Sequence, residues 1–169
     1  MADENVGLTG GLFADASAVT NEVANEVAEF RGGWTAEIVQ DHAEWFGQSI
    51  VRKDAELIRL DVILTVSEVA FKAASLAKIY GATTNGSDNL KSAGAEAATS
   101  YTFDSTQTAT ELQWLVECQL DGKTFQAFAG DGIAAGITIN FTNQDYVVYD
   151  LPITLYSATG SLMKFLIEN

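Results

Sequence analysis

The side chains best suited to catalysis are few in this chain and lie far apart in the sequence. His42 is the only histidine and Cys118 the only cysteine. His42 stands close to Asp41 and Glu44 and could act as a general base or a metal ligand, but a zinc site needs several His or Cys ligands. Serine stands nowhere in a nucleophile-elbow pattern, and Cys118 belongs to an apolar strand face, where a thiol is buried and inert. We therefore expect a protein that is not an enzyme and that has no catalytic, metal-binding or cofactor-binding residues.

Turns that contain glycine and aspartate raise two other possibilities, phosphate binding and calcium binding. The stretch GDGIAAG (130–136) lacks the G-x-G-x-x-G spacing and leads into an expected strand, whereas a phosphate site needs a helix N-terminus. Asp121, Asp131 and Asp145 lie at expected turns, without the spacing of an EF-hand. We interpret the glycine-rich stretch as a loop that joins strands and the aspartates as turn residues.

Composition favours one acidic domain. The chain has 169 residues and is 47% apolar, which is enough for one buried core. Nine basic and 23 acidic residues give a formal charge of −14, which disfavours tight binding to nucleic acid or to an anionic membrane. The acidic N-terminus does not resemble a signal peptide and no apolar run is long enough to cross a membrane, so we expect a soluble intracellular protein or one assembled inside a cell. The acidity is also compatible with a high-salt cytoplasm.

The clearest local prediction is a hairpin within ELQWLVECQLDGKTFQAFAG (111–130). Asp121-Gly122 suits a two-residue turn, which fixes the register of the two strands. One face is then wholly apolar and includes Cys118 opposite Phe125. The other face changes character along its length, and its cross-strand pairs are Gln119 with Thr124, Glu117 with Gln126, and Leu115 with Phe128. An apolar pair on the second face predicts that another part of this chain, or another chain, covers it.

The remaining pattern predicts a mainly β protein, a small β-sandwich or barrel with one flanking helix. We expect an N-terminal arm over 1–25 and a single domain over 26–169, in which short strands bulge at Gly32-Gly33. A long strand near 57–66 carries Asp61 and Ile63 on its second face, a helix follows over about 68–80, and a polar loop spans 81–99. Further strands are predicted near 100–104, 111–120, 123–129, 136–142, 146–156 and 162–167.

The end of the chain, YVVYDLPITLYSATGSLMKFLIEN, predicts a second hairpin. A turn at Thr159-Gly160 would pair Tyr156 with Met163 and Ile153 with Leu166. Both faces of this hairpin are partly apolar, so the sheets have more apolar surface than one small domain can bury. We therefore expect contacts between copies of the chain.

The order of these elements resembles that of the major tail tube proteins of tailed phages and archaeal tailed viruses. The resemblance covers nearly the whole chain, from the GGW turn (32–34) through ELIRLDVILTV and SEVAFKAASLAKIYG to LPITLYSATGSLMKFLIEN, without a diagnostic motif. It implies hexameric rings that stack into a hollow tube for viral DNA, in a virion tail assembled in the host cytoplasm. The implied partners are further copies of the chain, tape-measure, tail terminator and baseplate or tail-tip proteins, whereas DNA passes without specific binding and no membrane is bound.

The same resemblance implies roles for particular residues. A channel that conducts DNA should repel it, which acidic and amide side chains do. The expected channel-lining residues are Glu117, Gln119, Gln126, Glu111 and Asp61. The expected subunit-interface residues are Leu115, Phe128 and Ile63. The competing interpretation of the polar residues is an outer surface in contact with solvent.

Two other functions remain open from the sequence. One is another phage-like β structural protein: an injection-system inner tube, a tail terminator or a capsid decoration protein. The other is a small-ligand-binding or enzymatic β-barrel, which needs converging polar groups in an apolar pocket. The sequence shows no such cluster.

Overall fold

The computed structural model shows a mainly β protein, with 66% strand and 5% helix, built on a closed barrel of six strands with further strands and one short helix. It describes residues 9–46, 52–71, 73–91, 94, 96–105, 108–134, 148–155 and 162–169. The fold class expected from the sequence is therefore confirmed.

The barrel is made by strands from both halves of the chain. The elements in chain order are β1 (Gly10–Asp15), β2 (Glu26–Phe30), β3 (Trp34–Phe46), β4 (Arg52–Phe71), α1 (Ala73–Tyr80), β5 (Thr83–Asn89), β6 (Ala97–Thr102), β7 (Leu112–Leu120), β8 (Lys123–Ala134), β9 (Val148–Leu155) and β10 (Met163–Ile167). Antiparallel pairs close the ring in the order β1, β2, β4, β9, β8, β7 and back to β1. In the described part of the chain, β3 and β10 end the sheet path as its two edges.

The core lies inside this ring. Alternate residues of each strand point inward and are almost completely buried, as the two-residue period of a strand requires. Trp114 is the largest of them and is 0% exposed, and its indole nitrogen donates a hydrogen bond to the Gly132 carbonyl at 3.0 Å. The other fully buried large side chains are Phe30, Leu12, Leu64, Ile79, Leu151, Ile153, Val27, Val66, Val69 and Val116.

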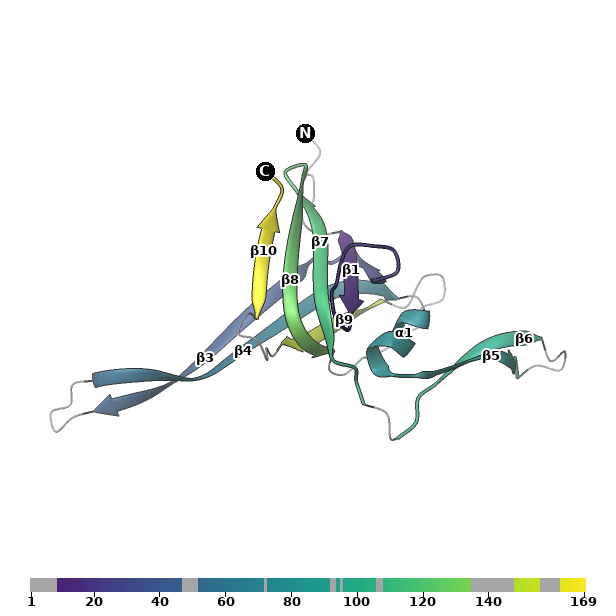
Figure 1. Cartoon of the computed structure of the whole chain (residues 1–169), viewed down its shortest axis with the longest axis horizontal. Coiled ribbons are helices and arrows are strands. Elements are labelled where there is room, and N and C mark those ends of the chain that lie inside the picture. The colour runs from purple at the N-terminus through teal and green to yellow at the C-terminus, as the bar shows by residue number, and fades with distance from the viewer. Residues whose placement is uncertain are drawn as a thin grey trace.

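Two ribbons project from the barrel in opposite directions (Figure 1). β3 and β4 pair residue by residue from Trp34 opposite Val66 to Phe46 opposite Arg52, and the far part of this hairpin extends well beyond the barrel (Figure 1). β5 and β6 form a separate two-stranded sheet on the side of α1. The predicted loop over 81–99 is thus wrong for these residues, because β5 and β6 pair from Thr83 opposite Thr102 to Asn89 opposite Ala97.

The N-terminal arm predicted over 1–25 is wrong where the structure describes it as β1. This strand pairs with β2 on one side and β7 on the other, and Leu12 and Ala14 are 0% exposed. The sequence of β1 is rich in small residues and glycine and does not by itself indicate a strand. Its partner β7 lies about a hundred residues later, so the pairing could not be predicted locally. A Cβ atom on Gly10 would collide with the Glu117 carbonyl oxygen, so glycine allows β1 to approach β7 closely.

The helix predicted to begin near 68 begins at Ala73 instead. β4 continues to Phe71 because Val69 pairs with both β2 and β9. The Ser67 amide donates to the Gly33 carbonyl at 2.9 Å and does not cap a helix, while Glu68 adopts a positive φ of 52° in a bulge. The helix ends at Tyr80, as expected, and Gly81 follows it with a φ of 67°.

The prediction of a hairpin at the end of the chain is also wrong. β9 pairs with β4 and β8, whereas β10 pairs with an earlier part of β8, so Ile153 lies opposite Leu64 and Ala134, and Leu166 lies opposite Gln126. The predicted turn at Thr159-Gly160, its partner Tyr156, and the strand near 136–142 lie outside the described residues.

Candidate functional site

The predicted hairpin at Asp121-Gly122 is confirmed in every cross-strand pair. Asp121 and Gly122 have φ values of 51° and 73°, as the turn requires. Glu117 lies opposite Gln126 and Leu115 opposite Phe128, on the face of β7 and β8 that points away from the core. Cys118 is 5% exposed on the core face.

The chain itself holds the Glu117 carboxylate in place. Glu117 Oε2 accepts a hydrogen bond from Gln126 Nε2 at 2.6 Å and another from Asn21 Nδ2 at 3.0 Å. Asn21 belongs to the segment 16–25, which joins β1 to β2 and therefore reaches over the outer face of β7. The question of what covers this face has a partial answer: residues of the same chain.

The five expected channel-lining residues do not gather in one place within a single copy. Glu117 and Gln126 are half-buried neighbours, and Gln119 is exposed beside the turn. Glu111 is exposed at the other end of β7. Asp61 is half-buried on β4, opposite Val39, and two strands lie between β4 and β7 in either direction around the ring. Their role as channel lining stays a prediction.

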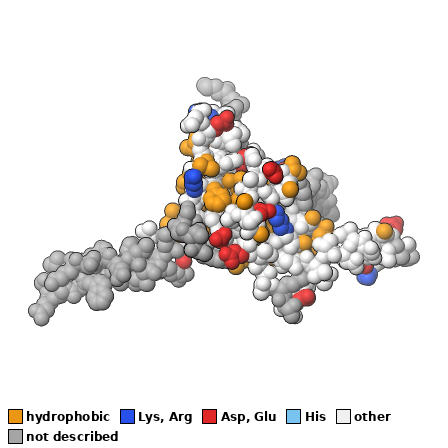
Figure 2. All heavy atoms as spheres, viewed as in Figure 1, with side chains coloured by type: hydrophobic (Ala, Val, Ile, Leu, Met, Phe, Trp, Pro, Cys, Tyr) orange, Lys and Arg blue, Asp and Glu red, His pale blue; other side chains and the backbone are white. Residues whose placement is uncertain are grey.

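The three expected subunit-interface residues differ in how much surface they offer. Leu115 is only 4% exposed within one copy, so it has little surface left for a neighbour. Phe128 and Ile63 are half-buried. Leu115 and Phe128 form part of a groove of about 340 Å³, together with Val19, Thr20, Asn21, Gln126, Lys164 and Leu166. Figure 2 shows hydrophobic side chains over β8 and β10, with basic side-chain atoms among them.

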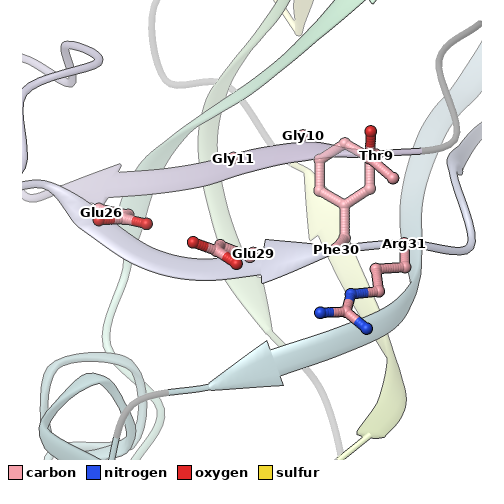
Figure 3. Close-up of a pocket in the computed structure, with 7 residues that line it drawn as sticks. All are labelled: Thr9, Gly10, Gly11, Glu26, Glu29, Phe30 and Arg31. Carbon is pink, nitrogen blue, oxygen red and sulfur yellow. The ribbon is translucent and has the colours of Figure 1, made fainter.

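A second hollow lies between β1 and β2 (Figure 3). Thr9, Gly10 and Gly11 line one side, and Glu26, Glu29, Phe30 and Arg31 line the other. Glu26 and Glu29 lie along β2, and Arg31 follows its end (Figure 3). Neither glycine has room for a side chain, since a Cβ on Gly11 would come within 2.7 Å of the Phe13 ring and one on Gly10 within 2.7 Å of the Phe30 ring.

The described residues contain no group of three or more His, Cys, Asp or Glu side chains that could hold a metal ion. His42 lies in β3 beside a bulge, with Leu57 as its backbone partner. The pKa of the Asp15 carboxyl group is lowered by hydrogen bonds from the backbone N–H groups of Ser17 and Ala18. Asp15 also lies 3.9 Å from Lys78. Both contacts are local to the structure around Asp15. Burial raises the pKa of Tyr80, whose hydroxyl has no hydrogen-bond partner in the part of the chain that is described.

Sequence reasoning missed the two sheet edges. Large apolar side chains are exposed on β10, where Phe165 is 52%, Leu166 41% and Ile167 59% exposed, and on β3, where Ile38 is 59% and Val39 39% exposed. Phe165 also stacks on Trp34 and Phe125, with ring centroids 6.2 and 5.9 Å away. The run MKFLI, apolar on both faces, was a signal for an edge that needs a partner.

A comparison of the chain with the profiles of known protein families gives no match, and a comparison with curated proteins gives none either. No helix in the described ranges is long and apolar enough to span a membrane.

Proposed function

We propose that this protein is a structural virion subunit that assembles into stacked hexameric rings, and that these rings form the hollow tail tube through which viral DNA passes. The observation that carries the proposal is the β3/β4 hairpin that extends beyond the barrel. From Val39 opposite Asp61 outward, β4 has only β3 as a described partner. An isolated two-stranded ribbon is marginally stable in water, so this ribbon needs a surface outside its own barrel.

The size of the hairpin supports a role in joining subunits. β3 has 13 residues. At ~3.3 Å per residue it is about 43 Å long, roughly the width of a small domain. The β5/β6 ribbon projects on the other side (Figure 1), which gives each copy two extensions for contact with neighbours. In the tail tube proteins that this chain resembles, arms and long loops join subunits and successive rings.

The charge of the chain supports the passage of DNA. With −14 per copy, a ring of copies repels the phosphate backbone and leaves it free to slide. We propose that exposed Gln119, with Glu117 and Gln126 beside it, faces the channel. The rival position is the outer surface of the assembly.

Electron microscopy of the purified recombinant protein tests the assembly. Hollow filaments or six-fold rings are the expected result. Compact single copies at high protein concentration would contradict the proposal, and a closed trimer would favour a decoration protein.

A lysine at position 119 tests the channel lining. Gln119 is exposed on the strand, so Gln119→Lys should leave folding and assembly unchanged. It places a cation on the channel wall of every copy, and the summed attraction to phosphate should slow genome delivery. The matched control is Gln119→Glu, which should deliver DNA normally. Equal infectivity of the two variants would remove this residue from the channel.

A further inference from the structure

The two free edges of the sheet, β10 and β3, have matching surfaces. We propose that the β10 edge of one copy pairs with the β3 edge of a second copy, head to tail, in a continuous sheet. This inference rests on the proposed function only in taking another copy of the chain as the partner.

Both edges need covering. An exposed apolar edge strand offers unpaired backbone groups and invites another strand, and proteins usually protect such edges with proline, charge or a bulge. β10 has no proline and one charged residue, Lys164, and is apolar at Met163, Phe165, Leu166 and Ile167. In β3, Ile38 and Val39 are exposed side by side, and the only bulges in its pairing with β4 lie farther out, after Asp41 and Trp45.

The faces of the two edges correspond. On the core side, β10 presents Met163 and Phe165, whose β8 partners Ala129 and Ala127 are buried, and Ile167, whose partner Phe125 is half-buried. On the core side of β3, Trp34, Ala36 and Ile38 lie opposite the buried Val66, Leu64 and Val62. Joined edge to edge, the two strands would continue one apolar face from copy to copy.

The outer faces carry opposite charges. Lys164 and Leu166 alternate on the outer side of β10, and Glu37 and Val39 alternate on the outer side of β3. If the two strands run parallel, one register of this two-residue step places Lys164 beside Glu37 and Leu166 beside Val39. In an acidic molecule with nine cations in 169 residues, a lysine at this position has a specific counterpart.

The charges also decide the symmetry of the contact. Pairing β10 with another β10 about a two-fold axis would put both Lys164 side chains on one face, and pairing β3 with β3 would do the same with Glu37. Only the mixed pair brings unlike charges together. A head-to-tail contact generates a ring when it closes and a filament when it does not.

Two variants, each with one edge blocked, test the pairing. Ile38→Lys blocks β3 and Ile167→Lys blocks β10, and both side chains are 59% exposed, so each variant should fold with an unchanged Tm. Each alone should be monomeric by sedimentation velocity, with self-association weakened at least about tenfold. Mixed in equal amounts, they should form a heterodimer, because one copy still has a free β10 and the other a free β3.

The outcomes separate the alternatives. Dimers of the Ile38→Lys variant alone would show a symmetric β10 contact and overturn the proposal, as would dimers of Ile167→Lys alone or a mixture that stays monomeric. Hollow tubes formed by both blocked variants would overturn this pairing while leaving the proposed function intact. Head-to-tail rings that never form tubes would support this pairing and contradict the proposed tail tube function.

A charge swap provides an independent check should a blocked variant fail to fold. Lys164→Glu or Glu37→Lys alone should weaken association about two- to fivefold, the size expected of an exposed ion pair, and the double variant should restore it. A double variant weaker than either single variant would contradict the contact.

Discussion

Single residues of this protein show how a small barrel fixes a unique core. Trp114 fills the interior, and its indole N–H donates to the Gly132 carbonyl of β8, next to the point where the β7/β8 register shifts. Gly132 leaves no room for a Cβ, which would come within 2.8 Å of Leu155. A large aromatic side chain is therefore buried here with its polar group satisfied.

Trp114→Phe should lower the free energy of unfolding by about 2–4 kcal/mol, because it leaves the Gly132 carbonyl without its partner and opens a cavity. Urea unfolding measured by circular dichroism would give the value. Leu120→Ala is a suitable control, since Leu120 is 39% exposed beside the turn and its loss should cost much less. Equal effects of the two changes would show that Trp114 is not a core residue.

At the scale of elements, the sequence predicted what local chemistry determines. The β7/β8 register follows from Asp121-Gly122, and the alternation of Val62, Leu64 and Val66 marks the core face of β4. The predictions failed where distant partners decide. β1 is a strand because β7 pairs with it. β4 continues past residue 68, where the helix was expected to begin, because Val69 pairs with two strands.

The candidate surfaces divide in the same way. The hairpin placed Glu117 beside Gln126 and Leu115 beside Phe128 correctly. The sequence did not indicate that segment 16–25 would reach Glu117 through Asn21. It predicted β9 and β10 as separate strands but paired them with each other, because which strand takes each part of the β8 edge depends on closure of the whole barrel.

Turn geometry at Gly122 gives a prediction for one element. A Cβ would meet nothing within 4 Å at Gly122 or at Gly86, but only Gly122 has a positive φ, of 73°. Gly122→Ala should therefore destabilise the protein by about 1 kcal/mol, whereas Gly86→Ala should be neutral or slightly stabilising. Thermal unfolding of the two variants compares them directly, and an equal change in Tm would rule out strain at the turn as the cause.

The whole molecule combines a complete core with uncovered edges. The barrel closes on itself and buries its interior, while Ile38 and Val39 of β3 and the large apolar side chains of β10 remain exposed at its edges. We propose that copies of this chain cover these edges for each other. The charge of −14 opposes that assembly, since like-charged copies repel.

Sedimentation velocity over a range of protein and salt concentrations tests this claim most directly. The account predicts particles that are multiples of the 18.1 kDa chain. It also predicts that association strengthens as salt rises from about 0.01 to 0.5 M, because the Debye length shortens from about 30 Å to a few Å and the repulsion is screened. A single species of 18.1 kDa at every protein and salt concentration would contradict the account.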